Sequence, residues 1–364
     1  MADPAAEDRI ARLRLIRSDN IGPSTYFQLV ARFGSASAAL AAIPDLAARG
    51  GGRPPRLAGR DKAEREIEHV ARIGARHLFL GDPLYPLLLA ETESAPPVLT
   101  AMGDAALFER PAVAMVGARN ASAAACRFAR QLARSVGEAG AAIVSGLARG
   151  IDTAVHDGSL ETGTIAVVAG GIDIYYPPEN EARQRAIAER GLVVAEQPPG
   201  TEPRARHFPW RNRIIAGLAN GTVVIEAAPR SGSLITARLA AESGREVMAV
   251  PGSPLDPRAQ GCNLLIREGA TLVQSADDIL EAIRPLAVPR FREPGLDFAP
   301  AAEHPDVGDS ERRAVTGLLA PTPVPVDEII RQSGLTAPVV QMILLELELA
   351  GRLERHAGGR VSLA

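Results

Sequence analysis

The feature that most constrains this chain is a series of short, almost uninterrupted apolar segments between Pro111 and Ile283, separated by stretches of helical character. Segments that are apolar at every position, rather than at alternate ones, are typical of strands buried on both faces of a parallel sheet. The intervening helices imply right-handed crossovers, so the sequence predicts an α/β fold with a doubly wound, mostly parallel sheet. The candidate strands are Val113–Val116, Ala142–Ser145, Ile165–Ala169, Leu192–Ala195, Val223–Glu226, Val247–Val250 and Thr271–Val273.

The N-terminal residues 1–78 predict a separate, small helical domain. The turn Asn20-Ile21-Gly22-Pro23 resembles the turn of a helix-hairpin-helix (or SAM-like) domain. Backbone N–H groups at such a turn can hold a DNA phosphate, but a plain helical cap explains the same pattern equally well. The expected helices are Arg9–Ile16, Tyr26–Phe33, Ser35–Ala42 and Asp61–Ile73.

The C-terminal residues predict a linker and a third domain. Prolines recur between residues 286 and 309, which is typical of a linker. Three predicted helices and a hairpin that turns at Gly358-Gly359 follow, in the order of a winged-helix domain. The helices are Glu311–Leu319, Val326–Gln332 and Ala337–Leu349, and the hairpin spans Leu353–Leu363. We therefore expect domains at 1–78, 79–285 and 310–364, with the linker at 286–309.

Composition excludes several classes of protein. No apolar run approaches the ~20 residues of a membrane-spanning helix, and the N-terminal residues lack the apolar core of a signal peptide, so a cytoplasmic location is expected. The two cysteines are far apart and the six histidines are scattered, so neither a metal site nor a cofactor is expected. The nucleotide motifs GxGxxG and GxxxxGK(S/T) are absent, which argues against dinucleotide-dependent oxidoreductases and P-loop NTPases.

Basic charge is informative only where it clusters, because the formal net charge is -3 and every basic residue except Lys62 is arginine or histidine. The densest cluster runs from Arg204 to Arg213 and includes a histidine and two aromatic residues but no acid. An apolar strand and the hydroxyl-rich turn Ser231–Ser233 follow, and we expect a helix to open near Thr236. Positive charge, a stacking surface and a helix N-terminus in one segment favour a polyanion as ligand.

Glycine follows several of the predicted strands, at Gly117, Gly146, Gly170, Gly232 and Gly252. Ligands of an open parallel sheet bind at the carboxyl ends of its strands. Glycine lets backbone N–H groups approach an anion closely, and the positive end of a following helix favours negative charge there. The sequence therefore predicts a phosphate-binding crevice at this edge of the sheet.

Structural roles are expected for the acids near these loops, because no paired acid and base is evident. Asp152 is expected to pin the Gly-Ile-Asp turn (150–152) that follows the strand Ala142–Ser145. Glu226 is expected to orient Arg211 or Arg213. If the arginine segment is helical, these two arginines point to different sides, so one can reach a ligand while the other pairs internally. The aromatic side chains of the arginine segment, Phe208 and Trp210, could either be buried as anchors or stack on bases. At Phe208 the two roles are equally well supported by the sequence.

Several blocks together resemble the DNA-processing protein A (Smf) family, the single-strand DNA binders of natural transformation. Their order and spacing fit from residue 80 to residue 285, which makes the resemblance specific. The blocks are VGAR (116–119), SGLARGID (145–152) with His156, GGIDIYYPPEN (170–180), FPWRNRIIAGL (208–218), SGSLITA (231–237), AVPG (249–252) and GCNLLIREGA (261–270).

This resemblance implies an extended Rossmann-like domain that binds single-stranded DNA, forms homodimers and delivers the RecA recombinase onto that DNA, without enzymatic activity. Family members often have lysine at the position of Ala205, so Arg204 or Arg206 is expected to take its place. The candidate DNA-binding residues are Gly117, Arg119, Asn120, Ser145, Gly146, Arg149, Gly150, Arg204, Arg206, Phe208, Arg211, Asn212, Arg213, Ser231, Gly232, Ser233 and Thr236. The candidate dimer contacts are Asn263, Ile266 and Leu272.

Two other functions stay open, and the winged helix has its own expectation. A nucleotide phosphohydrolase of the lysine-decarboxylase-like kind shares this type of fold, although Leu234 and Ile235 stand where its loop needs Gly and Thr. A pure protein-interaction adaptor is the other alternative. The last predicted helix, Ala337–Leu349, has no basic residue, so the winged helix is expected to contact protein or regulate the core rather than to read duplex DNA.

Overall fold

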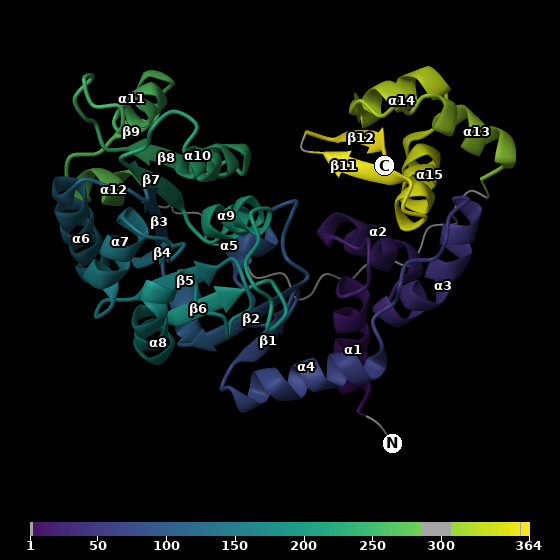
Figure 1. Ribbon diagram of the computed structural model, residues 1–364, viewed down its shortest axis with the longest axis horizontal. Helices are drawn as coiled ribbons and strands as arrows, with labels where there is room; N and C mark the ends of the chain where they lie inside the picture. Colours follow the sequence, from purple (N-terminus) through teal and green to yellow (C-terminus); the bar gives the residue numbers. More distant parts are fainter. Residues whose placement is uncertain (1–2, 285–306, 357) are drawn as a thin grey trace. The chain divides into compact units, whose positions relative to one another are not determined.

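The computed structural model describes residues 3–284, 307–356 and 358–364 (Figure 1). These residues form two compact units. The larger unit spans the described residues from Glu66 to Arg284, and the smaller unit combines residues 3–65 with the described residues from Val307 onward. The predicted linker lies almost entirely outside the described residues, and the domain limits expected above stay predictions.

The larger unit is built on a nine-stranded sheet in the order β1-β2-β6-β5-β4-β3-β7-β8-β9. All neighbours from β6 to β9 are parallel, whereas β1 pairs with β2, and β2 with β6, in antiparallel register. The predicted doubly wound, mostly parallel sheet is confirmed. The strands are β1 (Arg76–Phe79), β2 (Val98–Gly103), β3 (Ala112–Gly117), β4 (Ala142–Ser145), β5 (Thr164–Val168), β6 (Leu192–Ala195), β7 (Gly221–Ile225), β8 (Glu246–Ala249) and β9 (Thr271–Leu272).

Helices cover both faces of this sheet, which explains why its strands are apolar at every position. In β3, Val113 and Met115 pack with α6, α7 and α12, whereas Ala114 and Val116 pack toward α9, α10 and α11. The helices of this unit are α4 (Arg60–Arg72, which crosses the boundary between the units), α5 (Leu87–Ala90), α6 (Ala123–Glu138), α7 (Ile151–Ser159), α8 (Glu181–Arg190), α9 (His207–Gly217), α10 (Gly232–Glu242), α11 (Gln260–Arg267) and α12 (Ala276–Ala282).

The strand order creates a switch point beside β3. From β3 the chain adds β4, β5 and β6 on one side, and then returns to place β7, β8 and β9 on the other. The loops that follow β3 and β7 therefore leave the sheet on opposite faces and open a gap at its carboxyl edge. The candidate site described below lies there.

Three features differ from the sequence-based expectation. The antiparallel strands β1 and β2 were not predicted, because a proline-rich segment rather than a long helix separates them. Helix α10 begins at Gly232 rather than near Thr236, because the Ser231 side chain accepts a hydrogen bond from the backbone N–H of Ser233 and caps the helix. Helix α3 continues to Arg49, with Pro44 inside it, instead of ending at Ala42.

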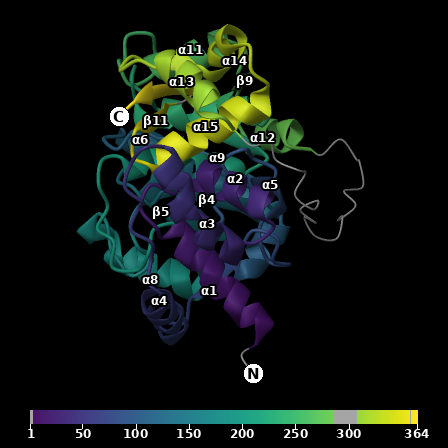
Figure 2. The same cartoon turned by 90° about the vertical axis from the view of Figure 1, so that its right-hand side faces the viewer.

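The smaller unit joins the N-terminal helices to the C-terminal helices and hairpin through one apolar core. Leu29 and Ile43 of the N-terminal helices share this core with Ile329 and Ile343, and α15 lies beside α2 and α3 (Figure 2). The predicted winged helix is confirmed. The elements are α1 (Pro4–Ile16), α2 (Pro23–Phe33), α3 (Ala36–Arg49), α13 (Asp309–Gly317), α14 (Val326–Ser333), α15 (Ala337–Leu349) and the sheet β10-β12-β11 (Val324–Pro325, Arg360–Leu363, Leu353–His356).

No single helix among the described residues is long and apolar enough to cross a membrane; only α2 and α3 taken together, with a bend of 102° between them, reach that length and composition.

Candidate nucleic-acid interface

The candidate site is a crevice at the carboxyl ends of β3, β4, β5 and β7, beside the switch point. It consists of two adjoining hollows of about 370 and 590 Å³ that share Arg119, Ala148 and Phe208 as lining residues. The larger hollow lies between the loop after β3 and the segment Ala228–Thr236 after β7. The smaller hollow extends to Gly170 and Tyr176, beyond the end of β5.

The first loop, which follows β3, is held open by Glu226 at the end of β7. The Glu226 carboxylate accepts hydrogen bonds from the backbone N–H of Ser122, at 2.8 Å, and from its hydroxyl, at 2.5 Å. Ser122 in turn caps α6. The expectation that Glu226 orients Arg211 or Arg213 is therefore wrong, because both of its oxygens already serve the loop that carries Arg119.

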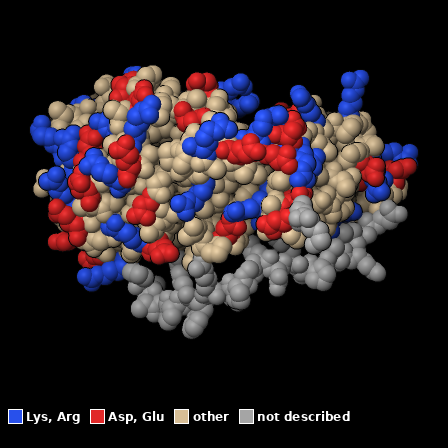
Figure 3. All heavy atoms as spheres, turned by 90° about the horizontal axis from the view of Figure 1, so that it is seen from below, with Lys and Arg blue, Asp and Glu red and all other residues tan. Residues whose placement is uncertain are grey.

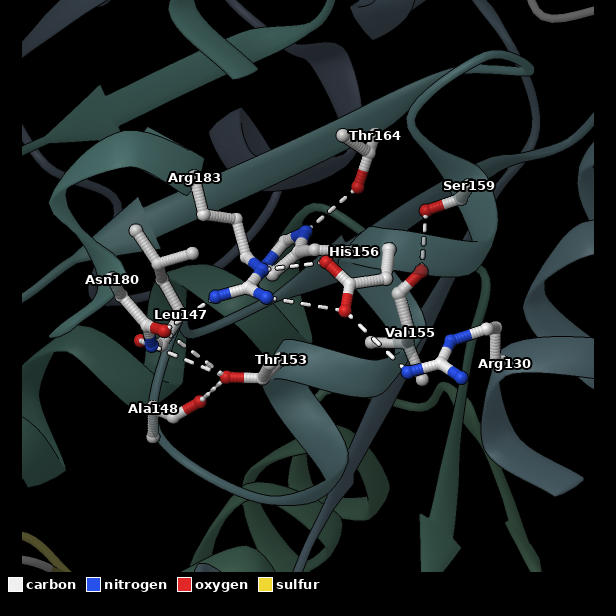
Figure 4. Close-up of polar contacts among 11 residues, drawn as sticks. Arg130, Leu147, Ala148, Thr153, Val155, His156, Ser159, Thr164, Asn180 and Arg183 are labelled. Carbon is white, nitrogen blue, oxygen red and sulfur yellow. Dashed lines mark hydrogen bonds and ion pairs between the residues drawn. The ribbon is translucent and has the colours of Figure 1, made fainter. Parts of the chain in front are cut away.

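A polar network formed by α7 and Asn180 sets the shape of the second loop, which follows β4 (Figure 4). The Asn180 side chain donates to the carbonyl oxygen of Leu147 at 2.9 Å, and the Thr153 hydroxyl donates to that of Ala148 at 2.8 Å. The carboxylate of Asp152 accepts from the backbone N–H of Ala148 at 3.2 Å, so its expected role in pinning this turn is confirmed. Gly150 has a φ of 74°, in the left-handed region that favours glycine.

Three side chains stack at the mouth of the crevice. The guanidinium carbon of Arg119 lies 5.1 Å from the centre of the Phe208 ring, and the rings of Phe208 and Tyr176 are 5.6 Å apart at 56°. Arg119 is exposed, and within the described part of the chain it has no carboxylate partner. An exposed cation beside accessible aromatic surface can receive a phosphate and a base together.

Arg211 places a second positive charge beneath the crevice. Its Nη1 donates to the carbonyl oxygen of Val167 at 2.9 Å, and its guanidinium lies against Gly146, where a side chain would collide with it. Burial lowers the pKa of Arg211 to about 10, so it stays protonated at neutral pH. Its Nε has no hydrogen-bond partner among the described residues. Burial also raises the pKa of the neighbouring Asp152 carboxyl.

Arg213, two residues further along α9, points away from the crevice. It donates to Glu196 and to the carbonyl oxygen of Ser94, and it lines neither hollow. The expectation that the two arginines diverge is confirmed, with Glu196 rather than Glu226 as the internal partner. The reason is that α9 turns about 100° per residue, so Arg211 and Arg213 lie on different sides of the helix.

The start of α10 forms the far wall of the larger hollow. The hydroxyls of Ser231 and Ser233 lie 2.7 Å apart, and, apart from Gly232's own chain neighbours and helix backbone, no atom of the described residues lies within 4 Å of the position that a side chain on Gly232 would occupy. Asn212 of α9 donates to the carbonyl oxygen of Gly232 at 3.2 Å and ties the two helices together. The positive end of α10 thus opens onto the crevice, where it favours an anion.

The crevice brings together most of the residues expected to bind DNA. Arg149 lines its rim, but its guanidinium is paired with Glu179. The predicted residues that line either hollow are Gly117, Arg119, Asn120, Gly146, Arg149, Phe208, Arg211, Asn212, Ser231, Gly232, Ser233 and Thr236. Those that do not are Ser145, whose hydroxyl donates to Met115, and Gly150, Arg204, Arg206 and Arg213.

Sequence reasoning assigned no role to Tyr176 or Arg230, which also line the crevice. Tyr176 is 47% exposed and stands before two prolines, and an aromatic residue in such a loop was the available signal. Arg230 has a φ of 67°, which its sequence neighbours do not reveal.

The protein has no overall positive charge, because its formal net charge is -3. On the face shown in Figure 3, arginine side chains are interspersed with aspartate and glutamate. Attraction for an anionic ligand must therefore arise locally, from the arginines and helix ends of the crevice.

Comparison with protein families gives matches over most of the chain. The model described as DNA recombination-mediator protein A matches residues 76–284. A DprA-like N-terminal HHH domain matches residues 6–69, and a DprA winged helix domain matches residues 299–359.

Individual relatives agree with these matches. DNA processing protein DprA of Streptococcus pneumoniae is 47% identical over 201 residues, covering 55% of this chain and 71% of that protein. Putative DNA processing protein DprA of Mycobacterium tuberculosis is 37% identical over 313 residues, covering 82% of this chain and 79% of that protein.

Two solved structures are also similar. The S. pneumoniae DprA crystal structure has a TM-score of 0.63 at 36% identity, covering 75% of this chain and 96% of that one. The structure of DNA processing protein A from Helicobacter pylori, described for its single-stranded DNA binding mode, has a TM-score of 0.52 at 27% identity, covering 56% of this chain and 94% of that one.

Proposed function

The chain belongs to the DNA recombination-mediator protein A (DprA) family, and we propose that it binds single-stranded DNA in the crevice, without marked base preference. The observation that supports this most directly is Arg119, exposed and without a carboxylate partner in the described part of the chain, against the ring of Phe208. The structurally similar protein from H. pylori binds the same class of ligand.

The two parts of a nucleotide would use different parts of the crevice. A phosphate would lie against Arg119 and the N-terminal end of α10, above the buried charge of Arg211. A base would stack on Phe208 or Tyr176, whose rings face the smaller hollow. Stacking accepts every base, so little sequence preference is expected.

The protein would act on this strand as a loading factor rather than as an enzyme. The matching family is described as a recombination mediator, which fits the delivery of RecA recombinase onto DNA taken up during natural transformation. That role would place the protein in the cytoplasm, with RecA and DNA as its partners and no cofactor. The acids nearest the crevice, Glu226 and Asp152, are engaged with backbone N–H groups, as structural carboxylates would be.

A homodimer through α11 and β9 is part of the same proposal. Leu264 and Leu272 are 38% and 41% exposed, and β9 is the last strand of the sheet. Ile266 is partly buried against its own core, and Asn263 bonds to both backbone groups of Gly252 at 2.9 and 3.1 Å. Leu272, and the exposed part of Ile266, would therefore form the contact, with Asn263 holding the segment in shape.

The experiment is a fluorescence-anisotropy titration of labelled oligo-dT with the wild type, Arg119→Ala and Arg238→Ala. Arg238 is an exposed arginine of α10 that lines neither hollow, which makes it a matched control. A hydrogen bond to a charged group contributes about 1.5–3 kcal/mol, so Arg119→Ala should weaken binding by roughly tenfold to hundredfold. Arg238→Ala should leave it unchanged.

Other results would overturn this function. Tight binding that is unchanged in Arg119→Ala would place the DNA elsewhere, and would favour an adaptor with incidental DNA contact. No binding of oligo-dT, together with hydrolysis of a mononucleotide, would favour the phosphohydrolase.

A further inference from the structure

The outer side of α9 exposes a large aromatic side chain that the crevice does not use. Trp210 is 54% exposed and lines neither hollow. Its helix neighbours Arg211, Ile214 and Ile215 are buried. Trp210 is also the single tryptophan of the chain. A solvent-exposed tryptophan contributes little to the stability of the fold, so an anchoring role in the core does not explain the position of Trp210.

Positive charge without acidic partners lies beside this indole. Arg204 and Arg206 are exposed and have no ion pair within the described part of the chain. The first turn of α9 contains no acidic residue, and no acid occurs between Glu202 and Glu226. Cations at the N-terminal end of a helix are unfavourable for the helix itself, so these arginines do not serve its stability.

Helix geometry places Trp210 and Arg206 together. Residues four positions apart lie on the same side of a helix, which puts Arg206 at the start of α9 beside Trp210. Arg213, three positions after Trp210, lies on the same side of the helix. Its guanidinium donates to Glu196 and to the carbonyl oxygen of Ser94, which holds this side of α9 in place. The result is a surface made of one exposed ring and one guanidinium that has no ion pair among the described residues.

This surface and the crevice both involve the first turn of α9. Phe208 lines both hollows and precedes Trp210 by two residues, so the two rings point to opposite sides of the helix. Both belong to the first turn, where about 1.5 Å of rise separates successive residues. A strand that leaves the crevice over Phe208 therefore has to cross only the end of the helix to reach Trp210.

We propose that Trp210 and Arg206 form a second contact for the same single strand, in which a base stacks on the indole and a phosphate lies against the guanidinium. This contact rests on the proposed function, because the crevice supplies the strand. Single-stranded DNA alternates bases, which can stack, with phosphates, which are negatively charged. It therefore matches a surface that offers one aromatic ring and one guanidinium. The crevice would hold the first nucleotides, and Trp210 would set how much further the bound strand extends.

The single tryptophan makes the test direct. The intrinsic fluorescence of the wild-type protein is followed while oligo-dT of increasing length is added, with binding measured in parallel by anisotropy. Long strands should quench Trp210 and protect it from iodide, whereas the shortest strands that bind the crevice should do neither. Tight binding of long strands without any change in Trp210 would overturn the second contact and leave the crevice in place.

Variants separate the second contact from the first. Trp210→Ala should lose about tenfold in affinity for long strands and nothing for the shortest, since one stacked base is worth roughly that factor. Trp210→Phe, which keeps a ring, should retain most of the affinity. If Trp210→Ala binds every length as the wild type does, the second contact is wrong. If oligo-dT fails to bind the wild type at all, the proposed function itself fails.

A protein contact at the same surface gives a different result. Fluorescence that changes with protein concentration in the absence of DNA, and a Trp210→Ala variant that is monomeric where the wild type is dimeric, would assign Trp210 to an interface between copies and overturn the DNA contact.

Discussion

In the smaller unit, Arg312 and Arg355 of the winged helix lie against carboxylates, whereas Arg119 and Arg211 of the crevice lie against glycine, a backbone carbonyl and an aromatic ring. Arg312 holds the carboxylate of Glu346 at 2.8 and 3.1 Å, and Arg355 holds that of Glu348 at 2.8 Å. Arg119 and Arg211 have no such partner within ion-pairing distance in the described part of the chain.

The comparison teaches that the placement of acids, more than that of arginines, decides where positive charge remains available. In the winged helix, the positive charge of Arg312 compensates the buried carboxylate of Glu346 on α15, which is 1% exposed. In the crevice, Arg119 and Arg211 have no ion pair among the described residues, and the charge of Arg119 faces the solvent while that of Arg211 lies just beneath it.

Removing Arg312 should damage the smaller unit severely. Arg312→Ala leaves the buried Glu346 carboxylate without its partner, which costs about 3–5 kcal/mol in the free energy of unfolding. The measurement is chemical denaturation followed by circular dichroism, with the unit's own transition resolved. Arg313→Ala is the matched control, because Arg313 is the exposed neighbour on the same helix. Equal stability of the two variants would break the comparison.

The buried histidine behind the second loop should make the larger unit sensitive to acid. Burial lowers the pKa of His156 to about 3, from an ordinary value near 6.5. The unfolded chain therefore takes up a proton below pH 6.5 while the folded chain does not, and stability falls as the pH falls. The loss should be about 1.4 kcal/mol per pH unit in this window.

The measurement is the free energy of unfolding against pH for the wild type and His156→Gln. The difference between the two curves isolates His156 from the other groups that titrate. A difference that does not change between pH 6.5 and pH 4 would show that His156 takes up its proton in the folded state.

The smallest effect concerns salt. Each phosphate contact contributes about 0.7 to the slope of log affinity against log salt for a single strand. Arg119→Ala should therefore reduce the magnitude of that negative slope by about 0.7, whereas Arg331→Ala, which removes a surface pair with Glu328 in the winged helix, should not change it. Equal slopes in all three proteins would mean that Arg119 does not contact a phosphate.

Much of the fold could be predicted because it depends on local signals. The strands of the parallel sheet are short apolar runs that recur at regular intervals, and the glycine loops follow them directly. The winged helix shows its helix signals and a Gly-Gly turn in order. Strands β1 and β2 were missed for two reasons: Pro96 and Pro97 stand immediately before β2, and no long helix separates the two strands. Neither strand therefore shows the alternation with helices that marks the central strands.

The site could be predicted only in part. Its glycines and Arg119 follow from the rule that ligands bind at the carboxyl ends of strands. For Trp210 the sequence left a buried anchor, the commoner role, in competition with base stacking; the side chain is exposed, because α9 turns its other side to the sheet. Arg204 and Arg206 stand in the same arginine cluster as Arg211 but line neither hollow.

The amino-acid sequence was enough to predict the class of fold, the order of the strands from β3 onward and the edge of the sheet at which a ligand is expected. Hydrophobic periodicity and glycine placement act over a few residues, so they can be read without knowing what lies opposite. The family blocks added the kind of ligand to expect.

Only the tertiary structure decided which charges are paired. Arg213 with Glu196, Glu226 with Ser122 and Arg312 with Glu346 join residues far apart in the chain. Whether an arginine meets an acid, a carbonyl or solvent depends on which side of a helix it occupies and on what packs there. Burial then sets its charge and its pKa, and burial is a property of the assembled molecule.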